Sequence, residues 1–256
     1  MTGRGQASAG LILALGGAAV SLSLSACGGR DRLNGEQPGA AAVDAVTPVP
    51  GLPPSETAED SNERLARWRA IATTEDRARL RTWRNAWVDA LAQVPPRIIA
   101  ADPDLFTPDR ALPGALPSPG MYRCRTHKLG AIGSPGSVGG GDGGRGRSIL
   151  AYTGYDWFSC RIDTQGRAMK EGGLGFVKLG GSQRPVGIVY PATAKRAIFL
   201  GTMMLADERR AMRYGMDSRR NMAGIVERIG ERRWRIVLPY PQFESLLDVV
   251  ELAPAD

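Results

Sequence analysis

His127 is the only histidine in this 256-residue sequence, so any serine–histidine or cysteine–histidine mechanism would have to use it. Arg123 and Arg125 precede it at alternating positions, and on a strand all three side chains would share one face. Two neighbouring cations lower the basicity of an imidazole. No serine in a nucleophile-elbow motif accompanies the histidine. The sequence therefore predicts no catalytic residue, and a hydrolase that uses His127 is the alternative.

Carboxylate pairs occur at Asp207/Glu208 and at Asp217/Glu227, and we expect most of these side chains to be solvated. Glycosidase chemistry depends on the distance between two carboxylates, which a sequence does not contain. A periplasmic hydrolase that uses a carboxylate therefore stays open as an alternative. One histidine and few cysteines, with no patterned carboxylates around them, cannot make a closed tetrahedral metal site. We predict no metal and no cofactor.

Two polar loops are candidate binding sites. The first, at 180–185 (GGSQRP), lies between two predicted strands and combines a hydroxyl, an amide and a guanidinium, which recognises carboxylates or phosphates through paired hydrogen bonds. The second candidate site lies within residues 207–217, on the long loop before the strand predicted at 222–229. The alternative is a turn whose polar side chains hold its own backbone. The candidate binding residues are Ser182, Gln183, Arg184, Asp207, Glu208, Tyr214 and Asp217.

Residues 133–147 are rich in glycine, but they lack the Gly-Lys-Ser/Thr ending of a phosphate-binding loop and no clear helix follows them. We expect a disordered hairpin loop there.

The N-terminus has the layout of an exported precursor: Arg4, an apolar stretch over 7–24, and small residues before Cys27. The sequence Leu-Ser-Ala-Cys that ends at Cys27 resembles the lipobox of bacterial lipoproteins. The resemblance implies a signal peptide at 1–26 and acylation of Cys27, with palmitate as the label to look for. It also implies sorting to the outer membrane, facing the periplasm, because Gly28 follows. The alternative is a transmembrane helix, although the stretch is at the lower length limit.

Acylation of Cys27 would leave Cys124 and Cys160 as the other cysteines. Both fall in predicted strands, and the cell envelope is oxidising, so the simplest prediction is one disulfide between them. Two buried free thiols are the alternative.

The net charge of +7 comes almost entirely from arginine, since only four residues are lysine. Nucleic-acid binding would require basic residues on one face together with stacking aromatic side chains. The arginines are instead spread along the folded part, from Arg64 to Arg235. We therefore predict no nucleic-acid partner, and acidic lipid headgroups beside a tethered domain fit the positive excess better.

The chain divides by composition and hydrophobic period. Residues 27–60 are rich in Gly, Ala and Pro without a period, which predicts a lipidated, disordered tether. Residues 61–119 are predicted to form a helical segment and a proline-rich connector. Its main helix follows a cap at Thr73 or Thr74 and runs to Pro95, after a shorter helix. We interpret the tryptophans of its apolar stripe as buried against the domain. The stripe consists of Leu80, Trp83, Trp87, Leu91 and Val94.

From residue 121 onward the hydrophobic period is two, which predicts strands joined by tight turns. The predicted strands are 121–130, 148–154, 157–163, 173–179, 186–190, 196–205, 222–229, 232–238 and 246–252. We predict an α+β fold in which N-terminal amphipathic helices pack on an antiparallel, eight-stranded meander β-barrel at 120–256.

Several motifs resemble a family of bacterial domains of unknown function, over about residues 70–253. The matching segments are 83–87 (WRNAW), 120–125 (GMYRCR), 181–185 (GSQRP), 199–202 (FLGT), 223–230 (AGIVERIG), 233–235 (RWR) and 244–248 (ESLLD). More distantly, the expected tethered barrel with a cysteine pair is similar to the small barrels of envelope lipoproteins that inhibit proteases or lysozymes. We expect a binding or inhibitor module in the cell envelope, with a protein or a small anionic ligand as partner. A scaffold without a small ligand is a further alternative.

Overall fold

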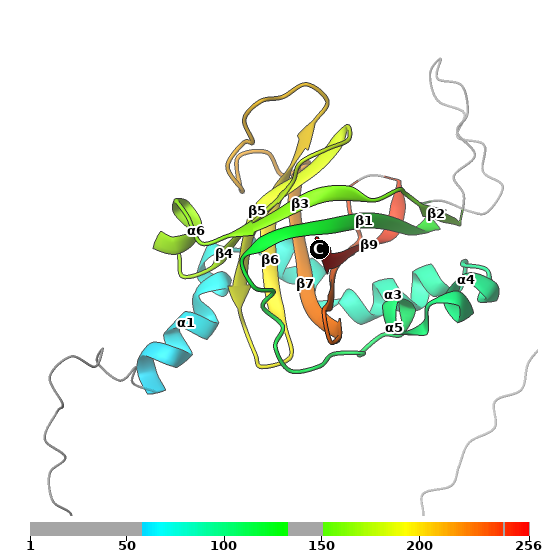
Figure 1. The fold of residues 1–256 in the computed structure, drawn as a ribbon, viewed down its shortest axis with the longest axis horizontal. Helices are drawn as coiled ribbons and strands as arrows, with labels where there is room; N and C mark the ends of the chain where they lie inside the picture. The colour runs from blue at the N-terminus through cyan, green and yellow to red at the C-terminus, as the bar shows by residue number, and fades with distance from the viewer. Residues whose placement is uncertain (1–57, 133–150, 243, 256) are drawn as a thin grey trace, which may run out of the picture. The chain divides into compact units, whose positions relative to one another are not determined.

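Eight antiparallel strands close into a barrel within the part of the chain that the structure describes (Figure 1). The computed structural model describes residues 58–132, 151–242 and 244–255. The predicted signal peptide, Cys27, nearly all of the predicted tether and the glycine-rich stretch at 133–147 lie outside these residues. The described helices and strands belong to one unit, Pro53–Asp256.

The sheet is a meander in which each strand pairs with its neighbour in sequence, and the last strand returns to the first. The barrel strands are β1 Gly120–Ala131, β3 Phe158–Asp163, β4 Leu174–Lys178, β5 Gln183–Pro191, β6 Ala197–Leu205, β7 Asn221–Gly230, β8 Arg233–Pro239 and β9 Ser245–Pro254. The short β2, Tyr152–Gly154, pairs with the second half of β1, beyond the end of β3. Pairing of β1 with β9 closes the barrel and leaves no long free edge. The predicted eight-stranded meander barrel is confirmed.

Alternation along the strands fills the barrel interior with apolar side chains. Phe176 and Phe199 pack edge to face at its centre, with ring centroids 5.6 Å apart. A Cβ at Gly187 would lie 2.6 Å from the Phe199 ring and 2.4 Å from a backbone oxygen, so glycine is required beside this ring. Cys124 and Cys160 are fully buried in the same interior and form a disulfide between β1 and β3, which confirms the predicted pairing.

The proline-rich connector crosses one end of the barrel and closes it. The Leu112 amide donates a hydrogen bond to the Arg228 carbonyl at 2.8 Å, and the Trp234 indole donates to the Gly114 carbonyl at 3.0 Å. Ala115 packs into the interior cluster. The chain thus seals the end where β5 meets β6, and any access to the interior must lie at the other end.

Six short helices accompany the barrel in the described residues: α1 Ala58–Ile71, α2 Thr74–Arg81, α3 Trp83–Leu91, α4 Pro96–Ala101, α5 Pro103–Phe106 and α6 Arg167–Lys170. Thr73 caps α2 by accepting a hydrogen bond from the Asp76 amide, as the sequence indicated. The prediction of one continuous helix up to Pro95 is wrong. The chain breaks at Thr82, whose hydroxyl bonds back to the carbonyls of the preceding turn, and α3 ends at Leu91.

A second apolar core lies between the helices and the outer face of the barrel. Trp83 and Trp87 are buried there, against outward-facing residues such as Val237 and Val249. α3 packs on β1, β8 and β9, whereas α1 contacts β5 (Figure 1). The interpretation of the tryptophans as core residues is therefore confirmed, since Trp83 is 5% exposed and Trp87 is fully buried.

Buried ion pairs on the outer face of the barrel lie at this interface, and one of their arginines also bonds to the helical segment. The Arg235 side chain is fully buried, binds Glu227 through two nitrogens at 2.6 and 2.9 Å, and donates to the Leu105 carbonyl at 2.7 Å. Arg196 donates to the other Glu227 oxygen at 2.8 Å. Glu227 is an exception to the expectation that most of the paired carboxylates are solvated, because α5 packs on this part of the barrel and the side chain is fully buried.

Candidate functional site

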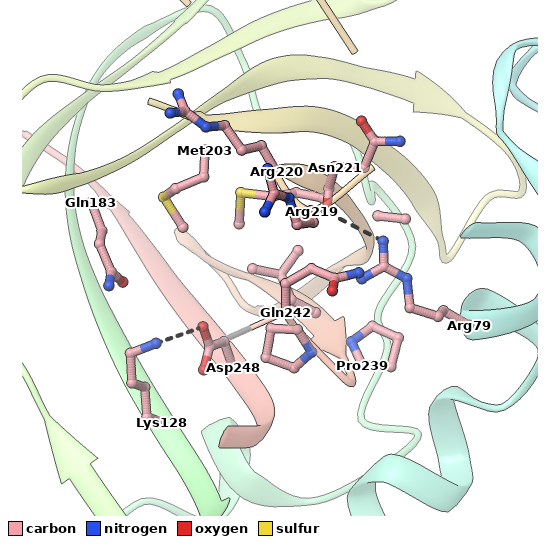
Figure 2. A pocket seen from close by; sticks show the side chains of 14 residues that line it. Arg79, Lys128, Gln183, Met203, Arg219, Arg220, Asn221, Pro239, Gln242 and Asp248 are labelled. Carbon is pink, nitrogen blue, oxygen red and sulfur yellow. Dashed lines mark hydrogen bonds and ion pairs between the residues drawn. The ribbon is translucent and has the colours of Figure 1, made fainter. Parts of the chain in front are cut away.

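A cavity of about 160 Å³ lies at the end of the barrel opposite the connector. Inward-facing side chains of β1, β4, β5 and β9 form its walls, and we call it the mouth cavity. Its polar lining is Thr126, Lys128, Tyr155, Lys178, Ser182, Gln183, Glu244 and Asp248. A smaller hollow of about 20 Å³ adjoins it and shares Lys128, Gln183 and Asp248; Figure 2 shows its lining. Exposed residues such as Ser182 and Glu244 form the rim, so the cavity is open to solvent.

The strand register directs two lysines into the barrel. Cys124 faces inward in the disulfide, so Thr126 and Lys128, two and four residues later on β1, face inward as well. Lys178 stands opposite Cys160 in the pairing of β3 with β4 and therefore shares its face. Both lysines are buried: Lys128 is 7% exposed and Lys178 is 6% exposed.

Lys128 is matched by carboxylates. Its Nζ lies 3.2 Å from Asp248 and 3.4 Å from Glu244, and Figure 2 shows the first of these contacts across the strand pair β1–β9. Burial disfavours the charge, but Asp248 and Glu244 outweigh it and raise the pKa of Lys128. Burial also raises the pKa of Asp248, against the opposing effects of Lys128 and of a hydrogen bond from the Ser245 hydroxyl. The pair is satisfied within the protein.

Lys178 has no carboxylate partner among the residues that the structure describes. Its Nζ donates a hydrogen bond to the Gln183 carbonyl at 3.1 Å and lies 4.0 Å from the centroid of the Phe158 ring. Burial and the nearby charge of Lys128 lower the pKa of Lys178. An ammonium held over an aromatic ring and a carbonyl is partly stabilised, yet its positive charge is uncompensated.

The deeper lining of the mouth cavity is apolar. Met203, Met222, Leu238, Pro185 and Val250 contribute to it. Methionine side chains adapt to ligands of different shape, because they are unbranched and polarisable. The site therefore combines one uncompensated cation with a soft apolar floor, and this combination suits a small amphiphilic anion.

The structure places the first predicted binding loop in two different environments. Ser182 and Gln183 line the mouth cavity. Arg184 points to the other face of β5, and its guanidinium donates to the carbonyls of Ala206 and Glu208 at 2.7 Å each. This guanidinium anchors the loop after β6, as in the alternative interpretation of a turn that ties down backbone groups.

The second predicted cluster does not converge on one point. Asp207 is exposed, whereas Glu208 accepts a hydrogen bond from the Leu205 amide at 2.8 Å and pairs with Arg220. Tyr214 donates its hydroxyl proton to Asp76 of α2, and burial raises the pKa of this phenol. Asp217 accepts from the Arg219 amide at 3.0 Å. These side chains order the loop between β6 and β7, which borders the smaller hollow through Arg219 and Arg220.

His127 lies on the outer face, as its alternation with Cys124 indicated. Its Nδ1 is 2.9 Å from the Tyr152 hydroxyl, and its Nε2 is 3.5 Å from Glu251. The ring packs edge to face against Phe106 at 5.4 Å. Among its described neighbours no serine or cysteine contacts the imidazole, and the mouth cavity is on the other side of the sheet.

Within the described ranges no group of three or more His, Cys, Asp or Glu residues is placed to hold a metal ion. None of the helices in those ranges is long and apolar enough to span a bilayer.

The two lysines of the site could have been found from the sequence. Lys128 continues the inward series that begins at Tyr122 and Cys124, and Lys178 ends a strand whose alternation places it with Phe176. The signal was the presence of charged residues at positions where an interior strand face should be apolar.

Fold and site together define a small, closed, antiparallel barrel with a polar cavity at one end, lined by two buried lysines. The chain belongs to the family described as "Domain of unknown function (DUF4893)", whose model matches residues 68–252. This match covers α2 to α6 and nearly the whole barrel. No curated protein and no solved structure matches the chain.

Proposed function

We propose that this protein is a binding module, and not an enzyme, that holds a small anionic ligand with a short apolar chain in the mouth cavity. The observation that carries the proposal is Lys178, a buried cation in an open cavity with no carboxylate partner in the described part of the chain. A buried charge without a partner is unfavourable, and an anionic group bound beside it would remove much of that cost.

The size and lining of the cavity narrow the ligand class. A volume of about 160 Å³ is smaller than the roughly 300–1,000 Å³ of pockets that hold drug-sized ligands, which favours a small ligand over a large lipid. The carboxylate of a short fatty acid would lie between Lys178, Thr126 and the Gln183 amide. Its alkyl chain would lie against Met203 and Met222. Lys128 contributes less attraction, because Asp248 and Glu244 already neutralise it.

We also infer that the module is a lipoprotein of the cell envelope, tethered through Cys27 to the outer membrane and facing the periplasm. The lipobox-like Leu-Ser-Ala-Cys sequence supports this address, and the disulfide is of the kind that oxidising compartments allow. Incorporation of labelled palmitate should be lost in Cys27→Ser. Equal label in the wild type and this variant would contradict the tether.

Isothermal titration calorimetry with hexanoate tests the proposed site. We expect binding to the purified protein and at least a tenfold loss of affinity in Lys178→Met, which keeps the volume of the side chain and removes the charge. Lys195→Met, at an exposed position, is the matched control and should bind as the wild type does. No heat of binding to the wild type, or equal affinity of Lys178→Met, would refute the proposal.

A further inference from the structure

The four lysines of the chain divide into two pairs. Lys170 and Lys195 are exposed on the surface, whereas Lys128 and Lys178 lie inside the barrel mouth. Counting the residues that the structure describes, Lys128 has two carboxylates within ion-pair distance and Lys178 has none. The environment of Lys178 therefore differs from that of the other three amines.

We propose that Lys178 is a carbonyl-reactive amine, which captures small aliphatic aldehydes in the mouth cavity as imines. This inference rests on the proposed function only for the access of small molecules to the cavity. It adds a covalent chemistry and a second ligand class to the same site.

The geometry leaves the ammonium form of this amine buried and without a counter-charge. The Phe158 ring and one carbonyl oxygen stabilise that form only partly, and the side chain is 6% exposed. The charged or titratable groups that line the cavity with it are Lys128 of β1, Asp248 of β9, Glu244 before β9, and Tyr155 before β3. Both acids contact Lys128, which leaves Lys178 without a carboxylate partner in the described lining of the cavity.

The direction of the pKa shift agrees with this geometry. Burial and the charge of Lys128 lower the pKa of Lys178, so a larger fraction of this amine is unprotonated at neutral pH than of an ordinary lysine. Enzymes that use lysine as a nucleophile activate it in the same two ways, by an apolar pocket and by a second cation.

The reaction is balanced without an oxidant or a reductant. The lone pair of Nζ adds to the carbonyl carbon, the C=O π bond breaks, and the oxygen takes one proton that the nitrogen loses. The carbinolamine then expels its oxygen as water together with the second amine proton, and a C=N bond forms. An aldehyde and an amine give an imine and one water, and the step is reversible by hydrolysis.

Competitive labelling tests the inference, with all four lysines measured in the same molecule. The purified protein is treated at pH 7 with propionaldehyde and sodium cyanoborohydride, which reduces each imine to a stable N-propyl group. Peptide mass spectrometry then gives the initial rate at each lysine. We expect Lys178 to react at least fivefold faster than Lys170 and Lys195. In urea-unfolded, reduced protein the four rates should become similar.

A repeat at pH 11 separates amine activation from simple access. Exposed lysines are then largely deprotonated, so the advantage of Lys178 should disappear or reverse. A Lys178 rate at pH 7 equal to or below those of the exposed lysines would overturn the inference, whether protonation or access is the reason.

The outcome is distinguishable from that of the proposed function. Hexanoate binding without fast labelling of Lys178 would remove the carbonyl chemistry and leave the anion site. Fast labelling of Lys178 without hexanoate binding would remove the anion site and leave the carbonyl chemistry. If both hold, saturating hexanoate should protect Lys178, but not Lys195, from propionaldehyde.

Discussion

Protonation of Glu251 should make the folded state strongly sensitive to acid. This side chain is only 4% exposed and lies on the outer face of β9, under the helical segment. It accepts hydrogen bonds from Arg125 at 2.6 Å and from Arg233 at 2.7 Å, and His127 lies 3.5 Å away. Burial alone would raise its pKa, but the nearby His127 ring, the hydrogen bond from Arg125 and the charge of Arg233 lower the pKa of Glu251 from 4.5 to about 2.

The sign and size of the effect follow from that difference. The carboxyl group releases its proton more readily in the folded state than in the unfolded state, so it stabilises the fold fully above pH 4.5. The contribution is lost as the pH falls from 4.5 towards about 2. At about 1.4 kcal/mol for each pKa unit, the shift corresponds to roughly 3 kcal/mol of unfolding free energy.

Urea unfolding of wild type and Glu251→Gln, followed by tryptophan fluorescence at pH 6 and pH 2.5, measures this contribution. The amide has nearly the same shape but cannot carry the charge, so the variant should be less stable than wild type by about 3 kcal/mol at pH 6. Most of that difference should vanish at pH 2.5. Glu231→Gln, at an exposed turn, is the control and should match the wild type at both pH values. An equal difference between wild type and Glu251→Gln at pH 6 and pH 2.5 would refute the reasoning.

Three further predictions concern other contacts and are tested by urea unfolding at pH 7. Replacing Cys124 and Cys160 by alanine should lower stability by about 4 kcal/mol, the loop-closure value for a separation of 36 residues, and a change below about 1 kcal/mol would mean that the disulfide does not constrain the unfolded chain. Lys128→Met should lower the unfolding free energy by about 3–5 kcal/mol, because Asp248 loses its cation. Lys178→Met should leave the unfolding free energy unchanged. Equal losses of stability would contradict the different pairing of the two lysines. Arg235→Met should also cost about 3–5 kcal/mol, and a loss limited to that of an exposed arginine would show that its carboxylate partner is satisfied without it.

Much of the barrel could be predicted from local pattern. The strand predicted at 196–205 is β6, Ala197–Leu205, and the one at 222–229 is β7, Asn221–Gly230. Both are short apolar runs bounded by turn residues, and both of their faces are buried, one in the barrel interior and the other in the core beneath the helices. The break at Thr82 was missed, since the apolar stripe continues through it and only the back-bonded hydroxyl marks the change.

The candidate site was harder to predict because it depends on contacts between distant segments. Which polar residues meet at the barrel end is fixed by closure of β1 on β9, which places Lys128 opposite Asp248. Ser182 and Gln183 line the mouth cavity, but Arg184 lies on the opposite face of the strand and binds backbone carbonyls. The burial of Glu227 could not be seen in its local sequence, because the helix that covers it lies more than a hundred residues earlier in the chain.

The pairing of β1 with β9 also restricts the order in which the domain can mature. A chain that is made and delivered from its N-terminus presents the first barrel strand long before residues 245–254 become available. Until then one whole flank of β1 has no hydrogen-bonding partner, and the growing sheet can recruit a strand from another copy. Closure of the barrel must therefore wait for β9. Removal of these ten residues should be as damaging to folding as a large internal deletion.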